Sequence, residues 1–322
     1  MNLNEIQDKI FDIQNEKSFE ECALQVFKLQ YDSNLVYKQY CDLINIKATE
    51  VTNLIEIPFL PIQFFKSQLI KTGQFQEEIT FTSSGTTGTN TSKHFVKDIK
   101  VYETSFLTAF EIAYPNWKQS TIIGLLPSYL ERSGSSLIYM VDYLIKHSHS
   151  KKSTFQLELT EDFTHYLQND PSPKIMFGVT FALLEIADKG IKPLNTTIIE
   201  TGGMKGRGKE LTREELHAVI NSKIQPDQLH SEYGMTELLS QGYLKDDYFI
   251  SPPWMKCFVR DTTDPLSTKT EGKGALNIID LANLHSCSFI ATEDLGEVKK
   301  EGFKVSGRID HSQIRGCNLL VI

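Results

Sequence analysis

The middle of the chain alternates short apolar runs with stretches in which apolar residues recur every three or four positions. Short runs bounded by turn residues are typical of buried strands, and the three-to-four spacing is typical of helices packed on one face. The expected strands are Thr121–Leu126, Thr154–Leu159, Lys174–Gly178 and Thr196–Glu200. The expected helices are Lys100–Ala113, Ser135–Lys146, Glu161–Leu167, Thr180–Asp188 and Thr212–Ser222. This alternation predicts an α/β fold with a mostly parallel sheet, flanked by helices, that binds ligands at its strand ends.

The two ends of the chain differ from the middle. Residues 4–46 have a helical pattern, with Ser18 and Glu21 spaced as a capping box. After about Ser240 the helical period fades, and short runs separated by Gly, Pro, Asp and Asn predict a β-rich subdomain. We therefore expect a helical preface and an α/β core in residues 1–240, and the β-rich subdomain in residues 241–322. The short runs are Tyr248–Ile250, Lys256–Val259, Ala275–Ile279, Cys287–Ala291 and Phe303–Ser306.

A loop rich in hydroxyl groups follows the expected strand Glu78–Phe81. Its sequence is Thr82-Ser83-Ser84-Gly85-Thr86-Thr87-Gly88. Hydroxyls and backbone amides freed by glycine can wrap an anionic group, so a phosphate is the expected ligand. The spacing of the glycines excludes a Walker loop, because that pattern needs a second glycine five residues after the first, followed by Lys and Ser or Thr. An ordinary Ser/Thr/Gly surface loop is the alternative.

A second candidate segment is Ser231-Glu232-Tyr233-Gly234-Met235-Thr236-Glu237. Its residue types suit a bound magnesium nucleotide. Tyr233 offers an aromatic face for stacking, Thr236 offers a hydroxyl donor, and Glu237 offers the hard oxygen ligand that Mg²⁺ prefers. The alternative is a short extended segment followed by a turn at Gly234.

Four segments in order resemble the motifs of the adenylate-forming superfamily, which includes acyl-CoA synthetases, luciferases and nonribosomal adenylation domains. The first two are the segments just described, and the others are Thr292-Glu293-Asp294-Leu295-Gly296 and Gly307-Arg308-Ile309-Asp310. The resemblance implies that Thr86 and the rest of the loop bind phosphate, Tyr233 lies against adenine, Asp294 binds the ribose hydroxyls, and Arg308 contacts ribose or phosphate. ATP and Mg²⁺ are the implied cofactors, with Glu237 as the metal ligand.

Two of these segments have alternatives of their own. Glu293 stands where the family usually has glycine, and an acidic surface turn would explain that segment equally. A strand-ending turn with a solvated ion pair would explain residues 307–310. Thr201-Gly202-Gly203 resembles the glycine-rich loop on the adenine side of the family's site, although a plain strand-to-helix turn fits as well. Residues 132–137 could line an acyl pocket or simply begin a helix.

The end of the chain resembles one branch of the superfamily. Family members usually continue past the aspartate equivalent to Asp310 into a mobile C-terminal domain, whereas this chain stops twelve residues later. The acyl-protein synthetases of the bacterial luminescence fatty-acid reductase system end in the same way. That resemblance implies that Cys317 accepts the acyl group, whereas a buried structural cysteine is the alternative. Lys93 stands two places later than the lysine of the family's common Thr-Gly-x-Pro-Lys sequence, and its role stays open.

The composition limits the classes of binding partner and the cellular compartment that we expect. The net charge of −8 and the scattered basic residues argue against a nucleic-acid surface. Five cysteines, none in a C-x-x-C pair, suggest neither a disulfide framework nor a zinc site. The absence of an apolar signal core or membrane-length run predicts a soluble cytoplasmic protein.

The sequence as a whole predicts an acyl-protein synthetase. The expected reaction turns a carboxylic acid, and by resemblance a fatty acid, into acyl-AMP and then loads the acyl group onto Cys317. An acyl reductase, an acyl carrier protein or coenzyme A is the candidate final acceptor. Two rivals stay open: a ligase core that loads coenzyme A or a carrier protein with a separate C-terminal domain, and a non-catalytic nucleotide or acyl-adenylate binding protein.

Overall fold

The computed structural model describes residues 3–83, 91–126, 134–202 and 211–309. These residues form two compact units. Of the described residues, the first unit contains those up to 64, 68–73 and those from 253 onward, and the second contains 65–67 and those between 74 and 252. The division of the chain at residue 240 that the sequence suggests stays a prediction, because the first compact unit contains both ends of the chain.

The second unit is built on a mainly parallel sheet with the order β10-β9-β8-β7-β6-β4-β5. Strands β4 to β8 pair in parallel, whereas β9 pairs antiparallel with β8 and with β10. The strands are β4 (Thr121–Leu125), β5 (Thr154–Phe155), β6 (Lys174–Gly178), β7 (Thr196–Glu200), β8 (Gln228–Tyr233), β9 (Gly242–Lys245) and β10 (Tyr248–Ile250). The mostly parallel α/β architecture expected from the sequence is confirmed for this unit.

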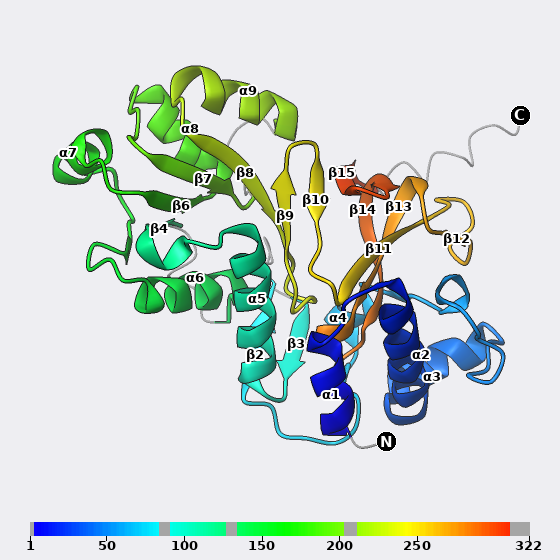
Figure 1. Cartoon of the computed structure of the whole chain (residues 1–322). Helices are drawn as coiled ribbons and strands as arrows, with labels where there is room; N and C mark the ends of the chain where they lie inside the picture. The colour runs from blue at the N-terminus through cyan, green and yellow to red at the C-terminus, as the bar shows by residue number, and fades with distance from the viewer. Residues whose placement is uncertain (1–2, 84–90, 127–133, 203–210, 310–322) are drawn as a thin grey trace, which may run out of the picture. The chain divides into compact units, whose positions relative to one another are not determined.

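Helices cover both faces of this sheet (Figure 1). On one face, Phe110 of α5 packs 5.7 Å from Phe177 of β6. On the other, His217 of α9 lies beside Ser231 of β8, with 3.0 Å between Nε2 and Oγ. The helices of the second unit are α5 (Ile99–Ala113), η2 (Trp117–Gln119), α6 (Ser136–His147), α7 (Glu161–Asn169), α8 (Thr180–Asp188) and α9 (Arg213–Lys223). A separate hairpin pairs β2 (Ile79–Thr82) with β3 (Lys93–Val96).

The first unit contains an antiparallel sheet with the order β12-β11-β13-β14-β15, and β1 pairs in parallel with β14. The strands are β1 (Leu60–Pro61), β11 (Met255–Arg260), β12 (Thr268–Lys269), β13 (Gly272–Asp280), β14 (Phe289–Lys299) and β15 (Gly302–Arg308). The helices are α1 (Leu3–Phe11), α2 (Glu16–Ser33), α3 (Leu35–Leu43), η1 (Leu54–Glu56) and η3 (Leu281–Asn283). The chain first passes from this unit to the other within α4 (Phe64–Ser67).

A buried glutamine holds α2 against the C-terminal part of the same unit. The Gln30 side chain donates hydrogen bonds to the carbonyls of Asn283 and Leu284 and to Ser288 Oγ, each at 3.1 Å. It accepts one from the Ser288 amide at 2.9 Å. The expected helical preface therefore packs on the β-rich part of the chain through a satisfied polar network.

Most predicted element boundaries lie close to those of the structure, and two of the differences have local reasons. The capping box of α2 is formed by Asn15 and Ser18, so the predicted box of Ser18 and Glu21 is wrong by one helical turn. The predicted strand Thr154–Leu159 ends after Phe155, because Thr160 caps α7 and the chain must turn towards it. None of the described helices is both long enough and apolar enough to cross a lipid bilayer.

Candidate active site

The carboxyl ends of four parallel strands in the second unit lie at the same edge of the sheet. Leu125 of β4 pairs with Gly178 of β6, which pairs with Glu200 of β7, which pairs with Ser231 of β8. Residues that follow these strands therefore gather at one edge of the sheet. Sites in open α/β sheets form beyond such carboxyl ends, and the segments from Thr201 and from Tyr233 onward both begin there.

The segment Tyr233–Glu237 leaves the end of β8 and is largely enclosed. Tyr233 is buried, with its ring 5.8 Å from that of Phe249. Gly234 is exposed, Thr236 is half-buried, and Glu237 is buried at 6% exposure. The segment therefore holds a carboxylate inside the protein while its glycine reaches solvent.

A histidine joins this segment to β3, the strand that follows the hydroxyl-rich loop. His94 Nδ1 lies 2.9 Å from the carbonyl oxygen of Thr236. Burial lowers the pKa of His94 to about 4, so the ring is neutral at pH 7 and its Nδ1–H donates to that carbonyl. His94 pairs with Phe81 across the β2–β3 hairpin, and the neighbouring pair is Thr82 with Lys93. The hairpin that carries Thr82 is thus tied to the segment that carries Thr236, through two residues that are 142 positions apart in sequence.

The base of the hydroxyl-rich loop has two further anchors. The Ser83 amide donates to the Ser92 carbonyl at 3.1 Å, and the Ser92 amide donates to Ser83 Oγ at 2.9 Å. The Thr82 amide donates to the carbonyl of Gly134 at 2.8 Å. Gly134 has φ +88°, and a side chain there would also collide with Thr82 Oγ1. Of the segment 132–137, which the sequence assigns to either a helix start or a pocket wall, Gly134 supports Thr82 and Ser135 caps α6, whereas residues 132 and 133 lie outside the described residues.

A buried carboxylate organises the loop after β7. Glu200 accepts hydrogen bonds from the Gly202 amide at 2.5 Å, from Thr180 Oγ1 at 3.1 Å and from Ser231 Oγ at 3.0 Å. Gly202 has φ +75°, which favours glycine because it has no side chain to strain the backbone. One residue thereby fixes the Gly202 turn to the strand that carries Tyr233.

Glu232 points to the opposite face of β8 from Ser231 and Tyr233. It pairs with Tyr243 of β9, and its carboxyl lies directly against Gly234. Burial, followed by the repulsion of Glu200, raises the pKa of Glu232 to about 8. Because this pKa lies above 7, the Glu232 carboxyl is protonated at neutral pH. Glu232 is partly exposed and lies next to the candidate site.

The remaining candidate residues with described positions lie in the first unit. Asp294 is in β14 and pairs in register with Arg308 of β15. Arg308 Nε donates to Asp294 Oδ1 at 3.1 Å, and the aspartate side chain is 8% exposed whereas the arginine is 77% exposed. Thr292 and Asp294 are buried within the strand, so the alternative of an acidic surface turn is wrong.

Several predicted site residues lie outside the described residues. They are Ser84, Gly85, Thr86, Thr87, Gly88, Gly203 and Cys317. The other four cysteines, Cys22, Cys41, Cys257 and Cys287, are buried and form no disulfide. Burial raises the pKa of Cys22 to about 11 and that of Cys41 to about 12, and it also raises the pKa of Cys287.

Over the described ranges, no three His, Cys, Asp or Glu side chains form a cluster that could hold a metal ion. Magnesium needs no such cage, because it is commonly bound by one or two carboxylates, water and substrate phosphates. Glu237 fits this requirement, since it places a hard oxygen ligand on a segment anchored by His94.

No protein-family model matches the chain, and no curated protein matches it in sequence. Among solved structures, the inhibitor-bound N-terminal domain of FACL13 from Mycobacterium tuberculosis is similar with a TM-score of 0.51 and 12% identity, over 75% of this chain and 63% of that one. The fold is that of the N-terminal core domain of adenylate-forming enzymes. The chain spans less than two thirds of that structure's length.

Two other similar structures have TM-scores below 0.5. The o-succinylbenzoate CoA synthetase MenE of Bacillus subtilis, bound with the product analogue OSB-NCoA, has a TM-score of 0.49 and 17% identity, over 73% of this chain and 50% of that one. Apo MbtA of Mycobacterium smegmatis has a TM-score of 0.47 and 13% identity, over 71% of this chain and 46% of that one.

The sequence did not indicate His94 or Glu200. His94 stands in an ordinary strand pattern, and its partner Thr236 is 142 residues away. Glu200 ends an apolar strand two residues before Gly202 and Gly203, which is the one local signal that could have marked it. Each of these residues holds a segment of the candidate site in place.

Proposed function

We propose that this protein activates a carboxylic acid with ATP, forming an acyl adenylate and releasing pyrophosphate. The observation that carries the proposal is the hydrogen bond between His94 and Thr236, at 2.9 Å. It fixes the segment that offers Thr236 and Glu237 to the hairpin that offers Thr82 and Ser83. A segment that carries a hydroxyl and a carboxylate just beyond the end of β8, and that is tied to a second hydroxyl-bearing segment, would suit a magnesium nucleotide.

This reaction requires that the acid and ATP are held in position and that negative charge on the phosphates is neutralised. A carboxylate oxygen of the acid forms a bond to the α-phosphorus of ATP, and the bond from that phosphorus to the pyrophosphate oxygen breaks. Negative charges approach one another in this step, so donors held in advance lower the barrier. Thr82, Ser83 and Thr236 would supply such donors, together with Ser84, Thr86 and Thr87. Mg²⁺ held by Glu237 would neutralise charge on the phosphates.

The remaining candidate residues would recognise the nucleotide. Asp294 would accept hydrogen bonds from the ribose hydroxyls, and Arg308 would contact ribose or phosphate. Tyr233 and the loop at Gly202 and Gly203 would meet the adenine. The buried carboxylate of Asp294 and the exposed guanidinium of Arg308 suit these two roles in polarity.

The finer proposal is that Cys317 then takes the acyl group. Its thiolate would form a bond to the acyl carbonyl carbon, the bond from that carbon to the AMP oxygen would break, and the thiol proton would pass to solvent. What supports Cys317 is elimination: the four described cysteines are buried, and burial raises the thiol pKa of three of them. A fatty acid is the proposed substrate, and a reductase, a carrier protein or coenzyme A the proposed acceptor.

A panel of carboxylic acids scored by pyrophosphate release tests the first step. We expect release with MgATP and at least one acid, abolished when ATP is replaced by a non-hydrolysable α,β-methylene analogue. Binding of ATP without pyrophosphate release for any acid would instead identify a nucleotide-binding protein.

Intact-mass measurement with the productive acid tests the second step. We expect a mass gain that is lost on treatment with hydroxylamine, and peptide mapping should place it on Cys317. The Cys317→Ser variant should keep pyrophosphate release and lose the mass gain, with Cys257→Ser as the matched control. Acyl transfer to free coenzyme A without any acyl-enzyme, or a thioester on Cys22, Cys41, Cys257 or Cys287, would contradict this step.

A further inference from the structure

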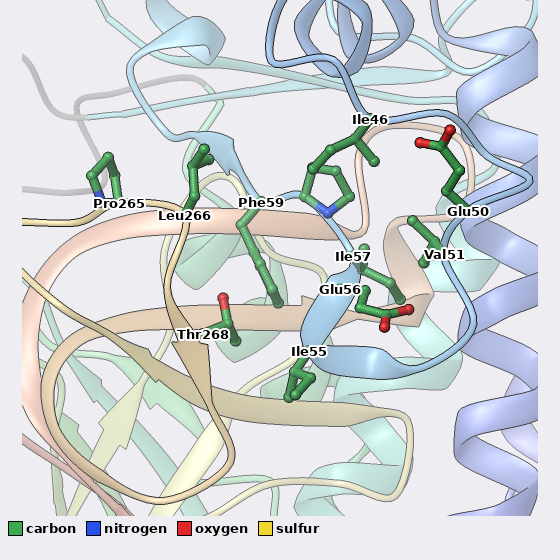
Figure 2. Close-up of a pocket in the computed structure, with 11 residues that line it drawn as sticks. Ile46, Glu50, Val51, Ile55, Glu56, Ile57, Phe59, Pro265, Leu266 and Thr268 are labelled. Atoms are coloured by element: carbon green, nitrogen blue, oxygen red, sulfur yellow. The ribbon is translucent and has the colours of Figure 1, made fainter.

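The first unit contains a cavity of about 360 Å³ that none of the proposed steps uses (Figure 2). One wall is the chain between α3 and β1, and the other is the turn that precedes β12. The lining residues are Ile46, Glu50, Val51, Ile55, Glu56, Ile57, Pro58, Phe59, Pro265, Leu266 and Thr268. Its volume lies at the lower end of the range that holds small organic ligands.

The floor of the cavity is apolar and fixed by its surroundings. Val51, Ile57 and Phe59 are at most 5% exposed. The Pro58 carbonyl accepts a hydrogen bond from the buried Tyr37 hydroxyl at 2.6 Å, and the Phe59 ring lies 5.9 Å from that of Phe258. A cavity with an anchored floor exists before any ligand binds, which reduces the ordering cost of binding.

The residues that line the cavity include two exposed apolar side chains and two exposed glutamates. Ile55 is 46% exposed and Leu266 is 52% exposed, so an occupant would remove apolar surface from water. Glu50 and Glu56 are exposed and belong to the same wall. No lysine, arginine or histidine is among the residues that line the cavity.

The carboxylate of Glu56 is held in its charged form. The Thr52 amide and hydroxyl donate to its Oε2 at 2.8 and 3.0 Å, and these hydrogen bonds lower the pKa of Glu56. The Lys47 amide likewise donates to Glu50 Oε2 at 3.3 Å. The lysines next in sequence to lining residues are Lys47, after Ile46, and Lys269, after Thr268, and neither lines the cavity. Two residues that line the cavity therefore carry a negative charge.

We propose that this cavity binds an organic cation with an apolar body, such as a protonated aliphatic amine. The body would cover Ile55 and Leu266 and contact Phe59, and the ammonium group would lie at Glu50 and Glu56. A carboxylic acid of the same length would bring a like charge to these groups. The cavity is therefore a second binding site with a charge preference opposite to that of the proposed acid substrate.

Three probes of equal chain length test the charge preference: octylammonium, 1-octanol and octanoate. We expect octylammonium to bind most tightly and octanoate least tightly, measured by titration of isoleucine δ1-methyl signals in NMR spectra. The signals of Ile46, Ile55 and Ile57 should shift, whereas those of Ile6 and Ile10, buried elsewhere in the same unit, should not. Shortening the chain should lower affinity by up to about fourfold per methylene group.

Two variants separate the contribution of charge to binding from that of apolar contact. The double variant Glu50→Gln, Glu56→Gln should weaken octylammonium binding by about tenfold and leave octanol binding unchanged. Glu301→Gln, an exposed charge in the same unit that does not line the cavity, is the matched control. Leu266→Ser should weaken all three probes alike.

Four results would overturn the proposal. They are no octylammonium binding at all, shifts confined to methyl groups outside the cavity, octanoate binding as tight as octylammonium binding, and unchanged octylammonium affinity in a folded double variant. None of these depends on pyrophosphate release, so this site and the proposed catalytic activity can fail separately.

Discussion

Arg308 donates from Nε to Oδ1 of Asp294 across the β14–β15 pair, at 3.1 Å. The two residues come from sequence motifs 14 positions apart, and the strand pairing makes them direct neighbours. A bulge between Leu295 and Gly296 shifts the register of β14 against β15. The pairing of Asp294 with Arg308 therefore cannot be read from the spacing of the two motifs alone.

The first prediction concerns nucleotide binding through Asp294. Asp294→Ala should weaken ATP binding by about 1.5–3 kcal/mol, because two ribose hydroxyls would lose a charged acceptor. Binding of 2′,3′-dideoxy-ATP should change little, since it lacks those hydroxyls. Calorimetric titration of both nucleotides checks this, with Glu297→Ala in the same strand as the control. Equal loss for the two nucleotides would mean that Asp294 acts through folding.

The second prediction concerns magnesium. Glu237→Gln keeps the size of the side chain and removes its charge, so pyrophosphate release should fall by about 10² or more. Part of the loss should be recovered at high Mg²⁺ concentration, because the remaining amide oxygen is a weaker ligand. Glu214→Gln on the exposed side of α9 is the control. Unchanged pyrophosphate release in a folded Glu237 variant would reject the metal assignment.

The elements were far easier to predict than the contacts between them. The bounds of β6, β7, α8 and β10 agree with the sequence prediction. Each of these elements is short and apolar and is bounded by polar or turn residues, so its limits are set by local chemistry. By contrast, β14 continues to Lys299 although the predicted strand ended at Ala291, because pairing with β15 keeps the acidic segment at Asp294 extended.

The candidate site was predictable in its residue types and not in its internal support. Tyr233, Thr236 and Glu237 stand close together in sequence, so a local motif identifies them. His94 contacts Thr236 only because the hairpin folds back on the end of β8, and Glu200 acts through partners on α8 and β8. Such contacts depend on tertiary packing, which periodicity and spacing do not encode.

The third prediction concerns His94 and acid stability. The pKa of His94 is lowered to about 4 in the folded protein, whereas the unfolded chain should titrate near 6.5. The unfolded state therefore binds more protons between these values, and stability present above pH 6.5 falls as the pH drops towards 4, by on the order of 2–3 kcal/mol. His94→Asn should remove this slope in urea unfolding curves, whereas His149→Asn, an exposed histidine, should not. An identical slope in all three proteins would show that other groups cause the acid sensitivity.

The fourth prediction concerns Gln30. Gln30→Ala leaves the Ser288 amide and the carbonyls of Asn283 and Leu284 without their partner in a buried setting. Unsatisfied buried groups of this kind should lower the free energy of unfolding by about 2–4 kcal/mol. Lys28→Ala, an exposed change in the same helix, should cost less than about 0.5 kcal/mol. Equal stability of the two variants would mean that water replaces the lost contacts.

The last prediction concerns Glu232, whose effect has the opposite sign to that of His94. Its folded-state pKa of about 8 lies above the value near 4.3 expected for the unfolded chain. The folded state therefore holds the extra proton, and stability that is full below pH 4.3 declines as the pH rises through 8. Glu232→Gln mimics the protonated form, so it should match the wild type at pH 4 and melt a few degrees higher at pH 9.

Thermal unfolding at both pH values checks this, with Glu214→Gln as the exposed control. A Glu232→Gln variant that gains as much at pH 4 as at pH 9 would show that packing, and not the titration of Glu232, sets the difference. Loss of pyrophosphate release in a more stable Glu232→Gln protein would further indicate that the carboxyl beside Gly234 serves the reaction at some cost to stability.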